Sequence, residues 1–198
     1  MPTQLHTKKW VVRQIAYWVW ITAVVIIGST YLAMPDMFSP ERVVKFIKTF
    51  EGEMMIAYII ATFLRGFFLI PSTPFVVGGA LLFPNQLLLV LAVSMAGVMF
   101  SASLLYYFSD ALGFSKKLEE KASDKVTLWK NRLRKPQATF FVLGWSFFPL
   151  VPTDVICYVA GIVKMPYRNM FIGVFLGELI LDIFYVYFGQ NVFTLLSA

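Results

Sequence analysis

The chain has 198 residues, of which 59% are apolar and only 14% are charged, and its formal net charge is +6. Soluble domains carry about 45–50% apolar and about 25% charged residues, so this composition excludes an ordinary soluble domain and a disordered chain. The single cysteine, Cys157, excludes a disulfide scaffold. At about 20 apolar residues per membrane crossing, the length accommodates roughly five or six membrane segments. We therefore expect a small all-α polytopic membrane protein.

The basic residues are concentrated in two stretches of the chain. The N-terminus carries Lys8, Lys9 and Arg13, and eight more basic residues lie between residues 109 and 135, whereas residues 35–53 are nearly balanced in charge. Short loops rich in Lys and Arg stay in the cytoplasm, so we expect the first two stretches inside and the third outside. The basic loop either only fixes this topology or also contacts anionic lipid headgroups. It lacks the interleaved aromatic residues of a nucleic-acid site, so no DNA or RNA partner is expected.

The N-terminal basic residues precede an apolar run from Ile15 to Met34. No small-residue cleavage site follows this run, so we interpret residues 11–33 as an uncleaved first transmembrane helix rather than a signal peptide.

A helix start follows at Ser39-Pro40-Glu41, with a capping hydroxyl, a proline at the first position and an acid in the first turn. Apolar residues then recur on one face, which predicts a short amphipathic helix on the outer surface or, alternatively, a linker packed into the core. These apolar residues are Val43, Val44, Phe46, Ile47 and Phe50.

Two apolar stretches of about 30 residues, 54–84 and 136–165, are each interrupted by a pair of prolines. A proline removes a backbone donor and pushes the preceding residue out of helical geometry. Broken backbone is tolerated in a bilayer only where protein or water satisfies its polar groups. Each stretch therefore predicts a re-entrant hairpin of two half-helices with the prolines at its tip, the alternative being a kinked spanning helix. The two proline motifs are Pro71-x-x-Pro74 and Pro149-x-x-Pro152.

The order of motifs repeats along the chain. Gly79-x4-Pro84 in the first stretch is matched by Gly161-x4-Pro166 in the second, and an apolar span follows each. With the charge asymmetry, this order predicts an inverted repeat of re-entrant helical hairpin plus transmembrane helix, an architecture common in secondary transporters. The predicted segments are 1–34 (basic tail and first transmembrane helix), 35–53 (outer amphipathic segment), 54–108 (first repeat, with a span over 86–108), 109–135 (basic cytoplasmic helix or loop), 136–190 (second repeat, with a span over 167–189) and 191–198 (tail).

Arg65 is one of four ionisable residues inside the apolar segments, where charges are costly and usually functional. Thr73 is expected to cap a helix that begins at Pro74, so that free N–H groups and the positive end of the helix dipole face the membrane midplane. With Arg65, these groups suit a phosphate. Alternatively, Arg65 extends to the interface or pairs with an acid. The candidate phosphate-binding residues are Arg65, Pro71, Ser72, Thr73, Pro74, Pro149 and Pro152.

The other three ionisable residues, Asp154, Glu178 and Asp182, are candidates for proton or ion coupling. Asp154 either stabilises a helix start or carries a proton when desolvated. Glu178 and Asp182 are one helical turn apart, and two like charges in hydrocarbon should not both ionise, so one should hold a proton. The alternative is that one pairs with Arg65 while the other reaches interfacial water.

Small residues at Gly78, Gly79, Gly97, Ser101, Gly161, Gly173 and Gly177 suit close packing of helices. His6 and Cys157 are each the only residue of their kind, and the sequence contains no nucleotide-binding loop or catalytic triad pattern. We therefore expect no enzymatic activity, no cofactor and no metal site.

Two segments carry a family resemblance. Phe148-Pro-Leu-Val-Pro-Thr-Asp-Val-Ile-Cys-Tyr-Val-Ala-Gly161 resembles the second signature of the DedA/VTT superfamily, also called the SNARE-associated Golgi protein family, and Ile70–Phe83 is similar to its first. The resemblance covers about residues 54–190. It implies opposed re-entrant hairpins, movement of phospholipid or polyprenyl-phosphate across a bilayer, and coupling to protons or sodium. Many members carry an arginine at the position of Ser146, so the role of that arginine is not transferred, and no acid clearly precedes the first proline motif unless Glu51 or Glu53 serves.

We therefore expect a flippase- or scramblase-like transporter of a lipid or lipid-phosphate, either coupled to protons or not. The alternatives are an ion-coupled transporter of a small anion and a membrane-organising protein that transports nothing. The expected location is a bacterial cytoplasmic membrane, crossed several times, with the N-terminus in the cytoplasm.

Overall fold

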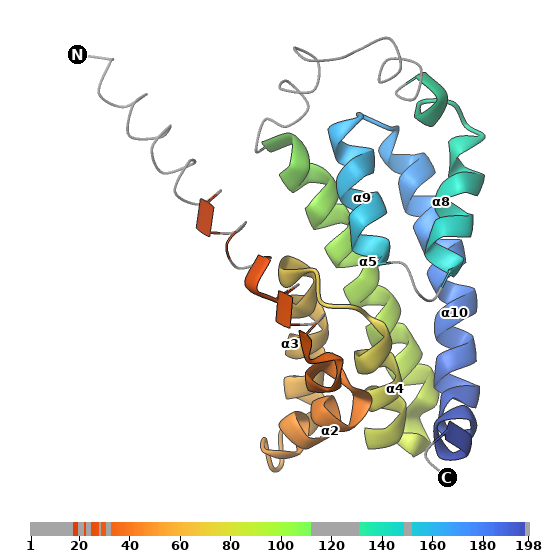
Figure 1. Ribbon diagram of the computed structural model, residues 1–198. Coiled ribbons are helices and arrows are strands. Elements are labelled where there is room, and N and C mark those ends of the chain that lie inside the picture. The colour runs from red at the N-terminus through yellow and green to blue at the C-terminus, as the bar shows by residue number, and fades with distance from the viewer. Residues whose placement is uncertain are drawn as a thin grey trace.

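The computed structural model describes residues 18–19, 22, 25–27, 29–30, 33–111, 131–148 and 152–196 (Figure 1). This part of the chain is built from helices, as expected for an all-α membrane protein. The helices are η1 (Pro35–Phe38), α2 (Pro40–Lys48), α3 (Met54–Leu64), η2 (Arg65–Phe68), α4 (Thr73–Leu82), η3 (Pro84–Gln86), α5 (Leu87–Ala111), α8 (Ala138–Phe147), α9 (Thr153–Ile162) and α10 (Tyr167–Leu196).

Within the described residues, two helices are long and apolar enough to cross a membrane. The qualifying stretches are Pro84–Ser109, with 26 residues, and Tyr167–Gly189, with 23 residues. At about 1.5 Å per residue, each is longer than a hydrocarbon core of about 30 Å. They correspond to α5 and α10 and to the spans predicted over 86–108 and 167–189.

Both proline motifs coincide with breaks between short helices. The first break runs from Leu69, whose φ of 55° is left-handed, to Ser72, and it separates η2 from α4. The second separates the end of α8 at Phe147 from the start of α9 at Thr153. The four short helices have 10 or 11 residues each, about half the length that a membrane crossing requires.

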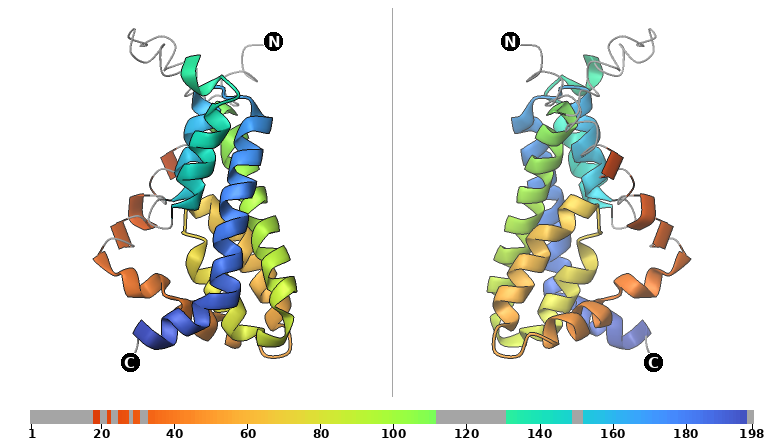
Figure 2. Two further views of the ribbon diagram at one scale, coloured as in Figure 1. Left: turned by 90° about the vertical axis from the view of Figure 1, so that its right-hand side faces the viewer. Right: turned by 90° about the vertical axis from the view of Figure 1, so that its left-hand side faces the viewer.

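The short helices occupy opposite halves of the bundle. Figures 1 and 2 show α3 and α4 beside one half of the length of α5 and α10, and α8 and α9 beside the other half. On α5, Ser94 bonds to Tyr58 of α3 at 3.0 Å, whereas Tyr106, three turns later, donates to the Met165 carbonyl after α9 at 2.5 Å. The first helix pair therefore contacts the beginning of α5 and the second contacts its end.

Glycine allows the long and short helices to approach closely. A Cβ atom placed on Gly97 of α5 would lie 2.6 Å from Thr62 Cγ2 of α3. On α10, a Cβ at Gly177 would lie 2.8 Å from the Leu143 carbonyl oxygen of α8. Both glycines are buried. The predicted packing role of these small residues agrees with the contacts, since a methyl group at either position would force the helices apart.

Helix α2 begins at Pro40, as predicted, but one detail of the prediction is wrong, because Ser39 makes no side-chain capping hydrogen bond. Among the apolar residues, Val43 and Ile47 are buried, whereas Phe46 is exposed. The buried pair packs against α4, where a Cβ on Gly78 would lie 3.2 Å from Val43 Cγ1. Phe46 therefore remains available to lipid on the outside of the bundle.

Several predicted elements lie wholly or mostly outside the described residues. They are the N-terminal basic tail, most of the first transmembrane helix over 11–33, most of the basic segment over 109–135, and Pro149.

Candidate functional site

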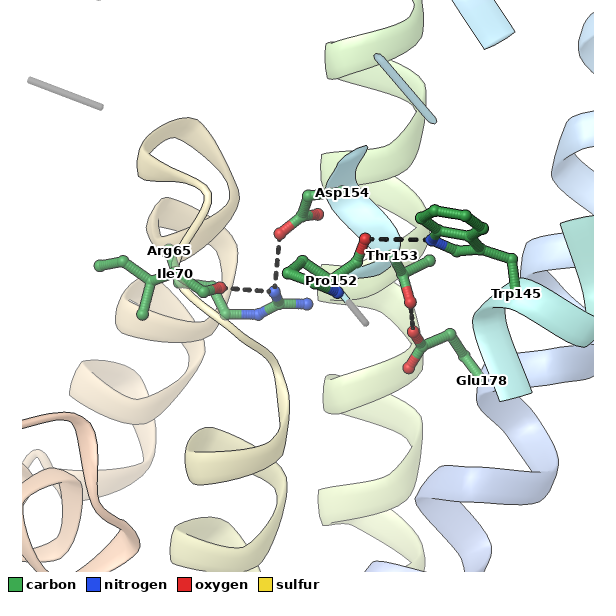
Figure 3. Close-up of polar contacts among 7 residues, drawn as sticks. All are labelled: Arg65, Ile70, Trp145, Pro152, Thr153, Asp154 and Glu178. Carbon is green, nitrogen blue, oxygen red and sulfur yellow. Dashed lines mark hydrogen bonds and ion pairs between the residues drawn. The ribbon is translucent and has the colours of Figure 1, made fainter. Parts of the chain in front are cut away.

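Arg65 and Asp154 meet where the two helix breaks approach each other. The Arg65 guanidinium donates to the Ile70 carbonyl at 3.0 Å and lies 3.6 Å from an Asp154 carboxylate oxygen (Figure 3). Arg65 stands at the start of η2 and Asp154 in the first turn of α9. Only 3% of Arg65 is exposed, so the side chain does not extend to the interface. Of the two alternatives to phosphate binding, extension to the interface and pairing with an acid, the structure therefore shows the pairing.

Helix α9 also carries the link from this ion pair to α10. Thr153, next to Asp154, donates its hydroxyl to a Glu178 carboxylate oxygen, and Figure 3 shows the two neighbouring side chains pointing to opposite sides. Asp154 faces the first break, whereas Thr153 faces α10. The start of α9 therefore connects the arginine to the acidic pair through adjacent residues.

The acidic pair is buried and incompletely hydrogen-bonded. Glu178 and Asp182 are 2% and 1% exposed. One oxygen of each carboxyl group, Glu178 Oε2 and Asp182 Oδ2, has no hydrogen-bond partner among the described residues, and the same holds for Arg65 Nε. Buried polar groups are normally satisfied, so unpaired ones indicate a place for a proton, water or ligand. Contrary to one alternative, it is Asp154 and not an acid of this pair that lies within salt-bridge distance of Arg65.

The cluster contains more acid than base. Among the described residues, Arg65 is the only buried basic side chain, whereas Asp154, Glu178 and Asp182 are all buried. Ser146, where the resembled family commonly has an arginine, lies beside α10, because a Cβ on Gly177 would be 2.7 Å from Ser146 Cβ. One guanidinium balances one carboxylate, and each uncompensated buried charge lowers the stability of the fold by roughly several kcal/mol. The cluster is therefore neutral only when two further positive charges, such as two protons, are present.

A cavity of 480 Å³ reaches Arg65 from the side of α2. Its lining includes two further basic residues, Arg42 and Lys45 of α2, and apolar residues such as Leu64 and Phe75. None of its described lining residues is acidic. Three cations on apolar walls match a ligand with a negative group and a hydrocarbon part.

The residues of the first proline motif are half-buried at the edge of this cluster. Thr73 is the first residue of α4 and therefore does not cap it, which corrects the prediction. The capping position belongs to Ser72, which makes no side-chain capping hydrogen bond. Pro71 precedes it in the break, and Pro74 lies in the first turn. The backbone N–H groups at the start of α4 are thus left without a side-chain cap.

The second proline motif is described only at its end, because Pro149 lies outside the described residues. Pro152 is exposed, and its extended backbone precedes the first residue of α9. Its carbonyl accepts a hydrogen bond from the Trp145 indole at 3.3 Å (Figure 3). This bond joins the end of α8 to the start of α9 across the break.

Sequence reasoning missed three members of the site. Thr153 gives no signal, because its partner Glu178 is 25 residues away and only the fold brings them together. Arg42 and Lys45 were assigned to a surface helix, although both line the cavity at Arg65. Their positive charge beside an apolar face was visible, but its direction toward Arg65 depends on how α2 packs.

Helices of this length, joined by breaks around buried charges, are consistent with an α-helical membrane protein. The VTT domain profile matches residues 70–191, more than half of the chain. The chain belongs to the VTT domain family, the family of DedA and SNARE-associated Golgi proteins. Comparison with curated proteins and with solved structures gave no match.

Proposed function

We propose that the protein moves a lipid or lipid-phosphate across the membrane and couples this movement to protons. The observation that carries the proposal is the buried ion pair of Arg65 and Asp154 at the end of a cavity with two additional cations. The apolar walls of this cavity favour a lipid, because a small soluble anion would leave the apolar surface without contacts.

In the proposed transporter, the two broken segments are re-entrant hairpins of an inverted repeat. Each pair of short helices occupies one half of the bundle, and each pair is followed in the chain by one long helix. The helix ends that flank both breaks lie near the middle of the bundle (Figure 1), and the Arg65–Asp154 ion pair joins η2 to the start of α9. This arrangement supports alternating access from the two sides of the membrane.

The charges at the two ends support an orientation. The end of the bundle at the start of α8 has five basic residues and one acidic residue, Asp110, among its described residues. The basic ones are Arg132, Arg134, Lys135, Lys164 and Arg168. The opposite end, formed by residues 35–53, has three basic and four acidic residues. Short positively charged segments stay in the cytoplasm, so the first end faces inward.

Labelling with a membrane-impermeant maleimide tests this orientation. In intact cells, the Glu51→Cys variant is expected to react, and the Arg134→Cys variant only after permeabilisation, since both positions are exposed at opposite ends. Cys157 is buried, so the parent protein is the unreactive control. Reaction of both variants from the same side would contradict the inverted repeat.

In the proposed mechanism, the substrate phosphate and Asp154 compete for the Arg65 guanidinium. Arg65 Nε has no hydrogen-bond partner among the residues that the structure describes, and Asp154 lies 3.6 Å from the guanidinium. A second anion can therefore bind to Arg65. When the phosphate binds, the Asp154 carboxylate loses its counter-charge and takes up a proton, because a lone buried carboxylate is strongly disfavoured. Departure of the phosphate restores the ion pair and releases that proton. Glu178 and Asp182 hold the two protons that keep the cluster neutral beside the path.

Transfer of fluorescent phosphatidylglycerol in proteoliposomes tests the function. We expect the native protein to accelerate transfer, and to do so faster toward the acidic end of the range from about pH 5 to pH 8, where the cluster is protonated. Glu178→Gln is expected to slow transfer and flatten this pH dependence while keeping the fold, because its amide oxygen still accepts from Thr153. Repetition without sodium separates proton from sodium coupling.

The outcomes separate the three candidate functions. No acceleration in either direction at any pH would leave a protein that only organises the membrane. Uptake of free phosphate without lipid transfer would instead identify a small-anion transporter. Wild-type behaviour of Glu178→Gln, with lipid transfer intact, would remove the acidic pair from the coupling site.

A further inference from the structure

A second cavity lies between α8 and α9, in the half of the bundle away from α2. Its volume is 530 Å³, and Arg65 and the three buried acids are not among its lining residues. The lining residues are Arg132, Leu133, Lys135, Gln137, Ala138, Phe141, Trp145, Val155, Ile156 and Val159. We call this cavity the α8–α9 cleft.

The α8–α9 cleft has a basic mouth and an apolar interior. Arg132 and Lys135, both exposed, lie before the start of α8, at the inward end of the bundle in the proposed orientation. From Ala138, near the basic mouth, to Trp145 at the other end of the cleft, α8 extends about 10 Å. Between these ends the walls come mainly from apolar side chains of α8 and α9.

The α8–α9 cleft is open to the bilayer. Phe141 and Val155, one from each wall, are 49% and 41% exposed. Exposed apolar side chains in a membrane protein face hydrocarbon, so a lipid chain can enter from the side. A lipid matches both features of the cleft, because its headgroup is anionic and its chain is apolar.

We propose that the α8–α9 cleft binds one hydrocarbon chain of an anionic phospholipid, with its phosphate at Arg132 and Lys135. The basic mouth complements the negative headgroup, and the apolar interior accepts a slender chain whose end approaches Trp145. This lipid occupies a site separate from Arg65, and its binding does not depend on transport.

Quenching of Trp145 fluorescence by lipids brominated on the acyl chain tests this binding. The full-length protein, carrying Trp→Phe substitutions at every other tryptophan, is reconstituted in phosphatidylcholine vesicles. Brominated phosphatidylglycerol is expected to quench Trp145 with at least about fivefold preference over brominated phosphatidylcholine, as one basic side chain near an anionic lipid contributes about this factor. The substituted tryptophans are Trp10, Trp18, Trp20 and Trp129.

Two variants complete the experiment. Arg132→Gln combined with Lys135→Gln is expected to abolish the preference. The control combines Phe140→Trp with Trp145→Phe, because Phe140 is on the same helix but 75% exposed and outside the cleft, so both lipids should quench it nearly equally. Equal quenching at Trp145, a preference that survives the double substitution, or the same preference at position 140 would overturn the proposal. None of these measurements requires lipid transfer, so the proposed function can fail independently.

Discussion

Arg65→Gln is expected to destabilise the protein and slow lipid transfer strongly. Substitution leaves Asp154 buried without its counter-charge, and breaking a buried ion pair costs about 3–5 kcal/mol. Loss of a charged hydrogen bond to the substrate costs a further 1.5–3 kcal/mol, about ten- to hundredfold in rate. Thermal unfolding in detergent measures the first effect, and transfer of labelled lipid in proteoliposomes measures the second.

The double variant Arg65→Gln with Asp154→Asn separates the two effects. Removing both charges is expected to restore most of the stability, because no unpaired ion remains buried. Transfer should stay slow, because the group that binds phosphate is still absent. Wild-type transfer by the stable double variant would show that Arg65 serves the fold alone.

Gly161→Ala is expected to lower stability by about 1–3 kcal/mol, the cost of overpacking a tight contact. A Cβ at Gly161 of α9 would collide with the Tyr106 carbonyl and the Ser109 hydroxyl of α5. Backbone atoms cannot rotate away, so α9 must shift, and the start of α9, which holds Asp154 and Thr153, shifts with it. We expect slower lipid transfer together with a lower unfolding temperature.

Gly144→Ala provides the matched control for Gly161→Ala. Gly144 also lies in a short helix, α8, but a Cβ there would meet no atom within 4 Å. Replacing a helical glycine by alanine in open space stabilises by about 0.5–1 kcal/mol, so this variant should be slightly more stable than the parent. Equal destabilisation of both variants would contradict the packing explanation.

The sequence alone predicted the features that depend on local chemistry. Proline geometry located the break after Leu69 and the break before Thr153, and apolar length located α5 and α10. The rarity of charge in apolar segments singled out Arg65 and the acids, all of which are buried. These rules need no knowledge of which helices are neighbours.

The sequence could not predict which residues become partners. For Arg65, the sequence indicates an acidic partner only in general, because residues 65 and 154 lie far apart in the chain and meet only in the folded bundle. Ser39 and Thr73 do not cap their helices as expected. Each helix has a proline at one of its first two positions, but no side chain bonds to its first N–H groups. The direction in which α2 presents Arg42 likewise depends on its contact with Gly78.

The contact between the first pair of short helices and the last long helix has a consequence for biogenesis. The first helix pair is completed by the last helix, since Val76 of α4 and Val186 of α10 belong to one buried apolar cluster and Gly189 packs beside Val77. During synthesis, more than a hundred further residues are therefore made after α4 before α10 can pack against it. Chains cut short before α10 would leave that surface open to the insertion machinery and to quality-control proteases.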